Sequence, residues 1–234
     1  MTMEGPDLSS LARTIGEPSR ARMLTLLMQG RALTAKELAY GVGIDPATGT
    51  AHLRRLHAEG LLTMVAQGRH KYFRLAGAEV AALVESMMVA SAAHAAAPMR
   101  DEPIRHARFC YDHLAGRLGT GLLNAFVERG ILARDDGSFA VTADGEAWFT
   151  AFGVDVDALR RGRRRFAAPC LDWSERTDHL AGALGAAIAE RMVAAGWIDR
   201  VRRSRAVTVT ELGRHELSRQ LGLSHTSEPR AAAG

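Results

Sequence analysis

The two cysteines of the chain each precede a copy of the pentapeptide DHLAG. Cys110 begins the segment CYDHLAG, and Cys170 begins the segment CLDWSERTDHLAG. No other cysteine occurs in the 234 residues. Thiolate and imidazole together are ligands for zinc and for softer transition metals. Cys110, His113, Cys170 and His179 could therefore close a tetrahedral site for a transition metal or metalloid, provided that the two copies meet in space.

Three other interpretations of these residues remain open. Two converging thiols could form a disulfide and respond to an oxidant. An organic effector could bind between the copies, against the aromatic rings of Tyr111, Trp173, Phe109 and Trp197. The residues could also be structural only, with no cofactor, because cysteine is often a buried core residue. A nearby carboxylate such as Asp172 could serve as a ligand or hold a ligand histidine. The candidate effector-sensing residues are Cys110, Tyr111, His113, Cys170, Asp172, Trp173 and His179.

The spacing of cysteine and histidine differs between the two copies. Cys110 and His113 are three residues apart, so on a helix they would share one face. Six additional residues, WSERTD, separate Cys170 from His179. We therefore expect the second thiol to be placed differently from the first, relative to its histidine.

The pentapeptide belongs to a longer repeat with an offset of 66 residues, which pairs Gly119 with Gly185. Each copy predicts an amphipathic helix, a glycine, a short β-hairpin and a second helix. Thr142 and Thr210 are placed as N-caps of the second helices. We expect a tandem duplication in which the two copies pack about a pseudo-twofold axis.

The first ninety residues predict short helices followed by a hairpin. Thr34 and Glu37 have the spacing of a capping box, and Asp45 is placed as the N-cap of the next helix. The segment GVG separates these two helices, which is typical of a helix-turn-helix. Alternating residues near 61–65 and 70–75 predict two strands that form a hairpin. A helix-turn-helix with a basic hairpin directly after it indicates a winged helix.

Five basic and two acidic side chains lie between Asp45 and Arg74, which favours contact with DNA phosphates. The segments GEPSRARMLTLLMQG, LTAKELAYGVGIDPATGTAHLRRLHAEGLL and QGRHKYFRL resemble the ArsR family of winged-helix repressors. The resemblance implies a homodimer whose recognition helices enter adjacent major grooves of a palindromic operator, on the order of 34 Å apart. It also implies that the first helix and the helix after the wing form the dimer interface.

The helix that begins at Asp45 would be the recognition helix. Its early residues are expected to face base edges or phosphates, and its later arginines to lie nearer the backbone. Gly49 departs from the β-branched residue common in the family, which loosens the helix by up to ~1 kcal/mol relative to alanine. The candidate DNA-binding residues are Thr48, Thr50, His52, Arg54, Arg55, Arg69, His70 and Lys71.

Metal-sensing members of the family carry cysteines in the helix before the turn, or an Asp/His/Glu set on the helix after the wing. The segment TAKELAYGVGI contains no cysteine, and the later helix offers only Glu79, Glu85 and His94. We therefore expect the signal to enter through the C-terminal half.

The expected fold class is α+β, mainly α with small β-hairpins. The expected domains are a winged helix-turn-helix DNA-binding and dimerisation domain at 1–95, a linker at 96–107, a duplicated helix–hairpin–helix sensor domain at 108–224 with repeats at about 108–154 and 170–224, and a flexible tail at 225–234.

We expect a homodimeric repressor that an effector releases from its operator. Two cysteines fit a reducing cytoplasm, and neither a signal peptide nor an apolar run of membrane-spanning length occurs. An enzyme is not expected, because no GxGxxG after a strand, P-loop, GxSxG or HExxH is present. The alternatives are a DNA-binding protein with an enzymatic C-terminal half and a constitutive architectural DNA-binding protein.

Overall fold

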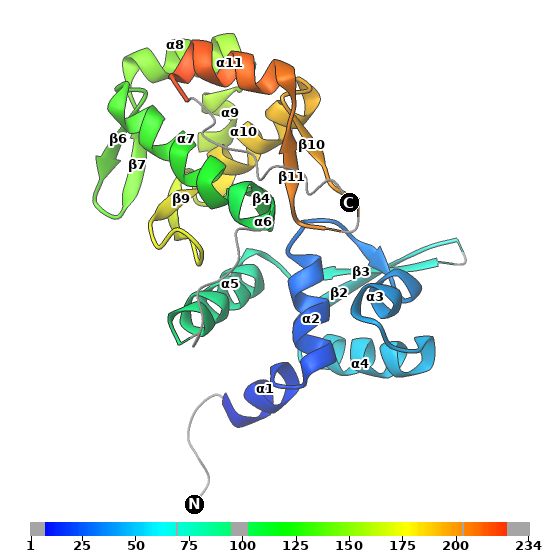
Figure 1. The fold of residues 1–234 in the computed structure, drawn as a ribbon. Helices are drawn as coiled ribbons and strands as arrows, with labels where there is room; N and C mark the ends of the chain where they lie inside the picture. The colour runs from blue at the N-terminus through cyan, green and yellow to red at the C-terminus, as the bar shows by residue number, and fades with distance from the viewer. Residues whose placement is uncertain (1–7, 69, 95–102, 203, 224–234) are drawn as a thin grey trace, which may run out of the picture. The chain divides into compact units, whose positions relative to one another are not determined.

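The computed structural model describes residues 8–68, 70–94, 103–202 and 204–223 (Figure 1). The chain divides into two compact units, Met1–Val84 and Glu85–Gly234. None of the helices in the described ranges combines the length and apolar character that a membrane span needs. The expected tail at 225–234 lies outside the described residues.

The first unit is a helix-turn-helix with a three-stranded antiparallel sheet in the order β1-β3-β2. Thr34 and Glu37 form the predicted capping box at the start of α3. At the start of α4, the carboxylate of Asp45 accepts hydrogen bonds from the backbone amides of Ala47 and Thr48. The two predicted N-caps are therefore confirmed. The elements are α1 (Leu8–Ile15), α2 (Pro18–Leu27), β1 (Leu33–Thr34), α3 (Ala35–Val42), α4 (Pro46–Ala58), β2 (Leu62–Gln67), β3 (His70–Leu75) and the first part of α5 (Ala78–Ala93).

Gly49 lies where α4 packs closely against α3. It is buried, and a Cβ atom added to it would lie 2.8 Å from the Cβ of Ala39 and 3.7 Å from the Cε of Met23. A β-branched residue cannot enter this space without moving one of the helices. Close packing of the two helices therefore accounts for the glycine in the middle of α4.

We expect Gly49→Val to lower the free energy of unfolding by about 1–3 kcal/mol, the usual effect of overpacking a filled core. The control is Ala51→Val on the exposed face of the same helix, which should change stability by about 0.5 kcal/mol through helix propensity alone. Urea denaturation of the two variants measures the difference. Equal midpoints for both variants would contradict the close packing of α3 and α4.

The second unit contains the same order of elements twice: hairpin, helix, hairpin, helix. The short helix α6 (Pro103–His106) precedes the first series, and α9 (Val156–Arg160) separates the two. The first series is β4 (Arg108–Cys110), β5 (His113–Ala115), α7 (Gly116–Glu128), β6 (Leu132–Asp135), β7 (Ser138–Val141) and α8 (Ala143–Phe152). The second series is β8 (Ala168–Leu171), β9 (Asp178–Ala181), α10 (Gly182–Ala194), β10 (Ile198–Arg200), β11 (Val207–Val209) and α11 (Glu211–Leu221).

The hydroxyl groups of Thr142 and Thr210 accept hydrogen bonds from the backbone amides of Gly145 and Gly213, respectively. The predicted N-caps of α8 and α11 are therefore confirmed. Most of each DHLAG copy is strand. Each copy first completes a hairpin, and the helix begins only at the glycine of the pentapeptide.

The expected helical placement of Cys110 and His113 is wrong. The two residues lie opposite one another on the antiparallel strands β4 and β5. Only Tyr111 and Asp112 separate the strands, and Tyr111 adopts a positive φ of 62° that reverses the chain. A tight turn between short apolar strands thus replaces the expected helical turn.

The expectation that the second thiol is placed differently is wrong for the same reason. Cys170 lies opposite His179 on β8 and β9. The additional residues form a loop between Leu171 and Asp178, beyond the paired part of the strands. Both hairpins therefore place a cysteine directly opposite a histidine, where cross-strand side chains come close together.

The hairpins and helices of the two series exchange partners. Helix α7 packs on β9, and α10 packs on β5.

The repeated glycine lies where each helix approaches the preceding strand of its own series. A Cβ atom on Gly119 would lie 2.4 Å from the carbonyl oxygen of Leu114, and one on Gly185 would lie 2.3 Å from that of Leu180. Glycine is needed at both positions because the helix backbone approaches the strand backbone directly. The repeated pentapeptide and the repeated glycine thus build two helix–strand contacts of the same kind.

Candidate functional site

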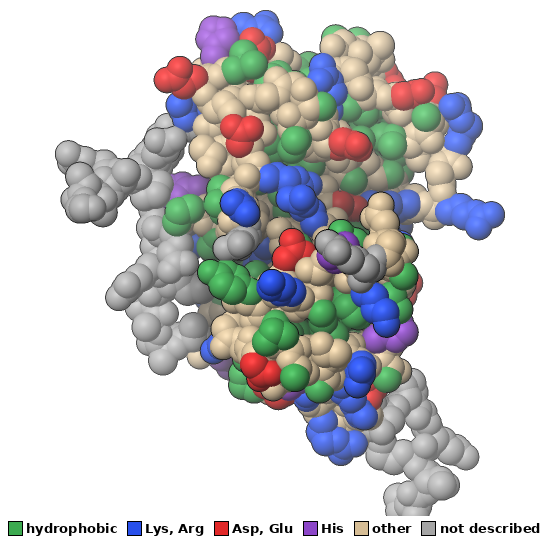
Figure 2. All heavy atoms as spheres, turned by 90° about the vertical axis from the view of Figure 1, so that its right-hand side faces the viewer, with side chains coloured by type: hydrophobic (Ala, Val, Ile, Leu, Met, Phe, Trp, Pro, Cys, Tyr) green, Lys and Arg blue, Asp and Glu red, His purple; other side chains and the backbone are tan. Residues whose placement is uncertain are grey.

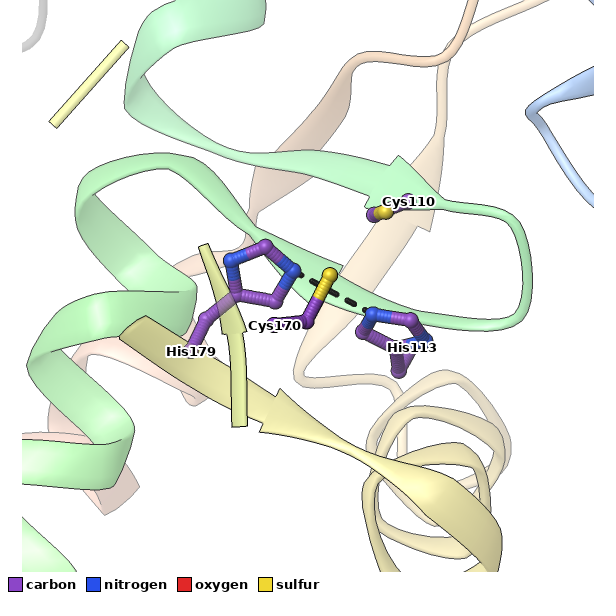
Figure 3. A group of neighbouring side chains, drawn as sticks. All are labelled: Cys110, His113, Cys170 and His179. Atoms are coloured by element: carbon purple, nitrogen blue, oxygen red, sulfur yellow. Dashed lines mark hydrogen bonds between the residues drawn. The ribbon is translucent and has the colours of Figure 1, made fainter. Parts of the chain in front are cut away.

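The two hairpins bring the four predicted ligands together (Figure 3). One ligand atom from each of Cys110, His113, Cys170 and His179 lies within 4.8 Å of the others. The Nε2 atoms of the two histidines face one another at 3.2 Å. Two nitrogen ligands of a tetrahedral zinc ion are about 3.3–3.4 Å apart when each Zn–N bond is about 2.0–2.1 Å. The separation of the imidazole nitrogens therefore fits a metal ion held by both rings.

The centre is largely shielded from solvent. Cys110, His113 and His179 are buried, and Cys170 is half-buried. Neither thiol forms a disulfide. The arrangement resembles the two-cysteine, two-histidine set of structural zinc sites in its ligand types.

Each histidine turns its other ring nitrogen toward a carboxylate. His113 Nδ1 lies 3.2 Å from Asp112 Oδ1, and His179 Nδ1 lies 3.3 Å from Asp172 Oδ2. A carboxylate behind the ring fixes the tautomer of a metal-bound histidine and directs its Nε2 lone pair to the ion. With both rings neutral in this tautomer, the two Nε2 lone pairs would point to one bound ion. Without an ion, a proton on one Nε2 can bridge the two nitrogens, which are 3.2 Å apart.

The thiols are held in different protonation states. The pKa of Cys170 is lowered to about 2, first by the hydrogen bond from the Cys110 thiol and then, against the effect of burial, by His113 and His179. The pKa of Cys110 is raised well above its ordinary value by the same hydrogen bond and by burial. Cys170 is therefore the thiolate of the pair, and Cys110 the thiol that donates to it.

When Cys170 is a thiolate, His179 is protonated. Burial lowers its pKa, but the contacts with the carboxylate of Asp172 and with Cys170 outweigh burial and raise the pKa to about 9. The centre thus pairs an imidazolium with a thiolate. Both Cys110 and His179 must lose a proton before a metal ion can bind to all four ligands.

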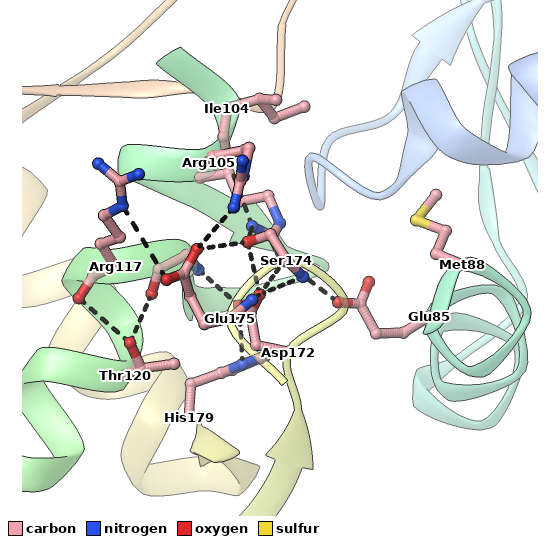
Figure 4. Close-up of polar contacts among 12 residues, drawn as sticks. Glu85, Met88, Ile104, Arg105, Arg117, Thr120, Asp172, Ser174, Glu175 and His179 are labelled. Atoms are coloured by element: carbon pink, nitrogen blue, oxygen red, sulfur yellow. Dashed lines mark hydrogen bonds and ion pairs between the residues drawn. The ribbon is translucent and has the colours of Figure 1, made fainter. Parts of the chain in front are cut away.

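Asp172 is a hub of buried hydrogen bonds behind the centre (Figure 4). Its Oδ1 accepts from Arg108 Nη2 at 2.9 Å and from the Ser174 hydroxyl at 2.8 Å, and its Oδ2 accepts from the Gly116 amide at 2.6 Å. Burial raises the pKa of Asp172, but the contacts with His179 and Arg108 hold it well below its usual range. Asp172 is therefore a fixed negative charge beside His179.

Three charged residues of this network escaped the sequence-based prediction. Arg108 is fully buried, and Arg205 and Glu85 are almost so. Glu85 Oε1 lies 3.5 Å from Arg108 Nη2, and Glu85 Oε2 lies 3.8 Å from Arg205 Nη1. Their burial follows from tertiary packing, and nothing in the spacing of the charged residues distinguishes them from surface residues.

The aromatic residues expected to hold an organic effector have other neighbours. Tyr111 is half-buried in the turn between β4 and β5, and the Trp173 ring stacks under the Arg108 guanidinium at 4.5 Å. The cavity where α7 and α10 meet β5 and β9 has a volume of about 10 Å³. That volume holds at most a single water molecule. This cavity is too small for an organic effector. A larger cavity of about 500 Å³, lined by Trp148, Phe152, Arg191 and Trp197, lies elsewhere between the two series.

The predicted recognition residues differ in how far they reach solvent. Thr48, Arg54 and Arg55 are exposed on α4. Thr50 is half-buried, and its hydroxyl donates to the carbonyl oxygen of Pro46 at 2.8 Å. Arg55 also pairs with Glu59 at 2.7 Å. The exposed residues are free of the core and lie on the element that a helix-turn-helix presents to DNA.

His52 lies in a different environment from the other early residues of α4. It is half-buried, and its Nδ1 lies 3.3 Å from Arg20 Nη1 and 3.6 Å from Glu17 Oε2. These two side chains belong to the start of α2, so His52 faces α2.

In the wing, His70 and Lys71 are exposed on β3, while Arg69 lies outside the described residues. On the face shown in Figure 2, Lys and Arg side chains are spread among acidic and hydrophobic ones. The positive charge of that face does not gather in one patch.

Comparison with known proteins places these elements in a family. A family profile described as a helix-turn-helix domain matches residues 15–65. The HTH-type transcriptional regulator YdfF of Bacillus subtilis strain 168 is 36% identical over 222 residues, which cover 93% of this chain and 98% of YdfF.

Solved structures of winged-helix regulators also match. The homodimeric winged helix-turn-helix domain of Mb0332 from Mycobacterium bovis, a possible ArsR-family regulator, aligns with 44% of this chain and 99% of its own at 23% identity and a TM-score of 0.36. The transcriptional repressor BigR of Xylella fastidiosa aligns with 36% of this chain and 85% of its own at 24% identity and a TM-score of 0.33. Because YdfF matches along nearly the whole of both chains and residues 15–65 match the helix-turn-helix profile, the protein belongs to the HTH-type transcriptional regulators.

Proposed function

We propose that this regulator is a homodimeric repressor whose second unit senses a thiophilic metal ion at Cys110, His113, Cys170 and His179. The observation that carries the proposal is the convergence of two thiols and two imidazoles, each imidazole backed by a carboxylate. The two series of elements in the second unit are, in this proposal, a tandem duplication that supplies one Cys-His pair each. No catalytic step is assigned to the unit.

On the DNA side, we propose that two copies of α4 enter adjacent major grooves of a palindromic operator. Thr48, Arg54 and Arg55 would make the contacts from α4, and His70 and Lys71 would contact phosphate from the wing. Thr50 would contribute through its hydroxyl, and His52 by holding α4 on α2. Metal binding would favour a dimer geometry that cannot engage both half-sites, which lowers operator affinity.

The donor set selects the class of ion. Two sulfur and two nitrogen ligands in a tetrahedral arrangement suit Zn²⁺ and the softer Cd²⁺ and Cu⁺, and they disfavour Mg²⁺ and Ca²⁺, which prefer oxygen. Titration with Co²⁺ tests the site, because the ion reports its own geometry by absorbance. The proposal predicts intense visible bands of tetrahedral Co²⁺ and a sulfur-to-cobalt charge-transfer band, both displaced by one equivalent of Zn²⁺. Weak octahedral bands, or none, would contradict it.

Metal affinity is expected to rise with pH. Below pH 9 the raised pKa of His179 keeps its ring protonated, and the raised pKa of Cys110 keeps its thiol protonated. Both protons must leave when the ion binds, so the affinity should fall by about 100-fold for each pH unit of acidification. Calorimetry in buffers of different ionisation enthalpy counts the protons. A release of about two protons agrees with the proposal, and a pH-independent affinity would exclude it.

A second candidate function is thiol redox sensing, favoured by the hydrogen bond between Cys110 and the Cys170 thiolate. Hydrogen peroxide could take two electrons from the two sulfur atoms, with one proton from the Cys110 thiol and one from the His179 imidazolium, giving one disulfide and two molecules of water. The double variant His113→Ala/His179→Ala separates the two candidates. A redox sensor would still form the Cys110–Cys170 disulfide with peroxide in this variant, but more slowly because the two histidines no longer favour the Cys170 thiolate, whereas a metal sensor would lose its response to Zn²⁺.

A further inference from the structure

We infer that Asp172, Arg108 and Glu85 form a buried relay that carries the occupancy of the metal centre to α5. The inference rests on the proposed metal sensing, and it names the route by which the centre controls the rest of the chain. The relay consists of side chains that reach no solvent, so each can move only with its neighbours. One end of the relay contacts a metal ligand, and the other end is a residue of α5.

At the metal end of the relay, an ion pair is joined to a hydrogen bond. His179 Nδ1 faces Asp172 Oδ2 at 3.3 Å, and Asp172 Oδ1 accepts from Arg108 Nη2 at 2.9 Å. An ion bound by Nε2 fixes the imidazole ring, and the ring fixes the carboxylate behind it. Because Asp172 and Arg108 are both fully buried, a shift of the carboxylate must be followed by the guanidinium.

The α5 end is loosely held. Glu85 stands between two buried guanidinium groups, at 3.5 Å from Arg108 and 3.8 Å from Arg205. Neither carboxylate oxygen of Glu85 has a hydrogen-bond partner among the described residues, nor do the Nε atoms of the two arginines. A buried network that is only partly satisfied is unfavourable as it stands. This end of the relay is therefore the place where a small displacement can exchange one pairing for another.

A change in the pairing of Glu85 would act on α5, which belongs to both units of the chain. The helix runs without interruption from Ala78 to Ala93, and Glu85 is the first of its residues in the second unit. The residues before Glu85 on the same helix belong to the winged-helix unit. A change in the pairing of Glu85 thus acts on a helix whose N-terminal half is part of the DNA-binding unit.

The test uses Glu85→Gln in the full-length protein, with Glu79→Gln on the exposed part of the same helix as the matched control. Zn²⁺ affinity is measured by chelator competition, and operator affinity is measured with and without Zn²⁺ at fixed salt. We expect Zn²⁺ to weaken operator binding by ~10-fold or more in wild type and Glu79→Gln, and by less than ~2-fold in Glu85→Gln. The Zn²⁺ affinity of Glu85→Gln without DNA should stay within ~3-fold of wild type, because no ligand has changed.

The outcomes separate the relay from the function on which it rests. If Zn²⁺ releases Glu85→Gln from the operator as it releases wild type, the relay is overturned and metal sensing stands. If wild type binds Zn²⁺ and keeps its operator affinity, both fail. Should Glu85→Gln fold poorly, hydrogen exchange of wild type decides the matter. Zn²⁺ must change the protection of the α5 amides around Glu85, and unchanged protection there overturns the relay.

Discussion

Cys170→Ser is expected to lower the affinity of the protein for Zn²⁺ by more than about 100-fold. Loss of an outer partner of a metal ligand already costs about 10–100-fold, and Cys170 is itself a proposed ligand and the thiolate of the pair. A serine hydroxyl stays neutral near pH 7 and is a poor ligand for a soft metal ion. Competition with a chromophoric chelator measures the affinity in the purified full-length protein.

The matched control for this prediction is His57→Gln, which removes an exposed histidine of α4. Its Zn²⁺ affinity should equal that of wild type. Equal affinities for Cys170→Ser and wild type would mean that zinc binds elsewhere and that the buried thiols are structural.

Gly119→Ala and Gly185→Ala are expected to destabilise the second unit by about 1–3 kcal/mol each, the usual range for overpacking. At both positions a Cβ atom would lie within 2.4 Å of a carbonyl oxygen of the preceding strand. Its next neighbours are the Cβ atoms of His179, at 3.4 Å from Gly119, and of His113, at 3.3 Å from Gly185. The substitutions should therefore also displace the ligand histidines and weaken metal binding.

Gly121→Ala is the control within the same helix as Gly119. Its added Cβ would lie 3.6 Å from Leu223 Cδ2, an ordinary contact. Alanine at this position should therefore stabilise the protein by up to about 1 kcal/mol through helix propensity. Thermal unfolding followed by circular dichroism ranks the three variants. Stabilisation by Gly119→Ala as well would contradict the close approach of α7 to the strand.

The first unit could be predicted from the sequence because its signals are local. The N-caps Thr34 and Asp45 are read from a few neighbouring residues, and the basic hairpin follows directly. Gly49 could not be explained in this way. Its reason is the contact with Ala39 on another helix, and that contact depends on how α3 and α4 pack.

The sequence identified the residues of the candidate site, but not the secondary structure that carries them. Cys110, His113, Cys170 and His179 do converge, but on hairpins. A spacing of three residues fits a helical turn and a tight hairpin equally well, so spacing alone could not decide between them. Arg108 and Glu85 were missed because burial of a charge depends on partners distant in sequence.

The central claim is that the Cys-His centre controls operator affinity, and fluorescence anisotropy of a labelled operator fragment tests it most directly. Wild-type protein would be titrated at one salt concentration, first metal-free and then with one equivalent of Zn²⁺ bound. The account predicts that Zn²⁺ weakens operator binding by ~10-fold or more, which is about 1.4 kcal/mol of coupling. Equal binding with and without bound Zn²⁺ would contradict the account and leave a DNA-binding protein whose buried centre serves structure alone.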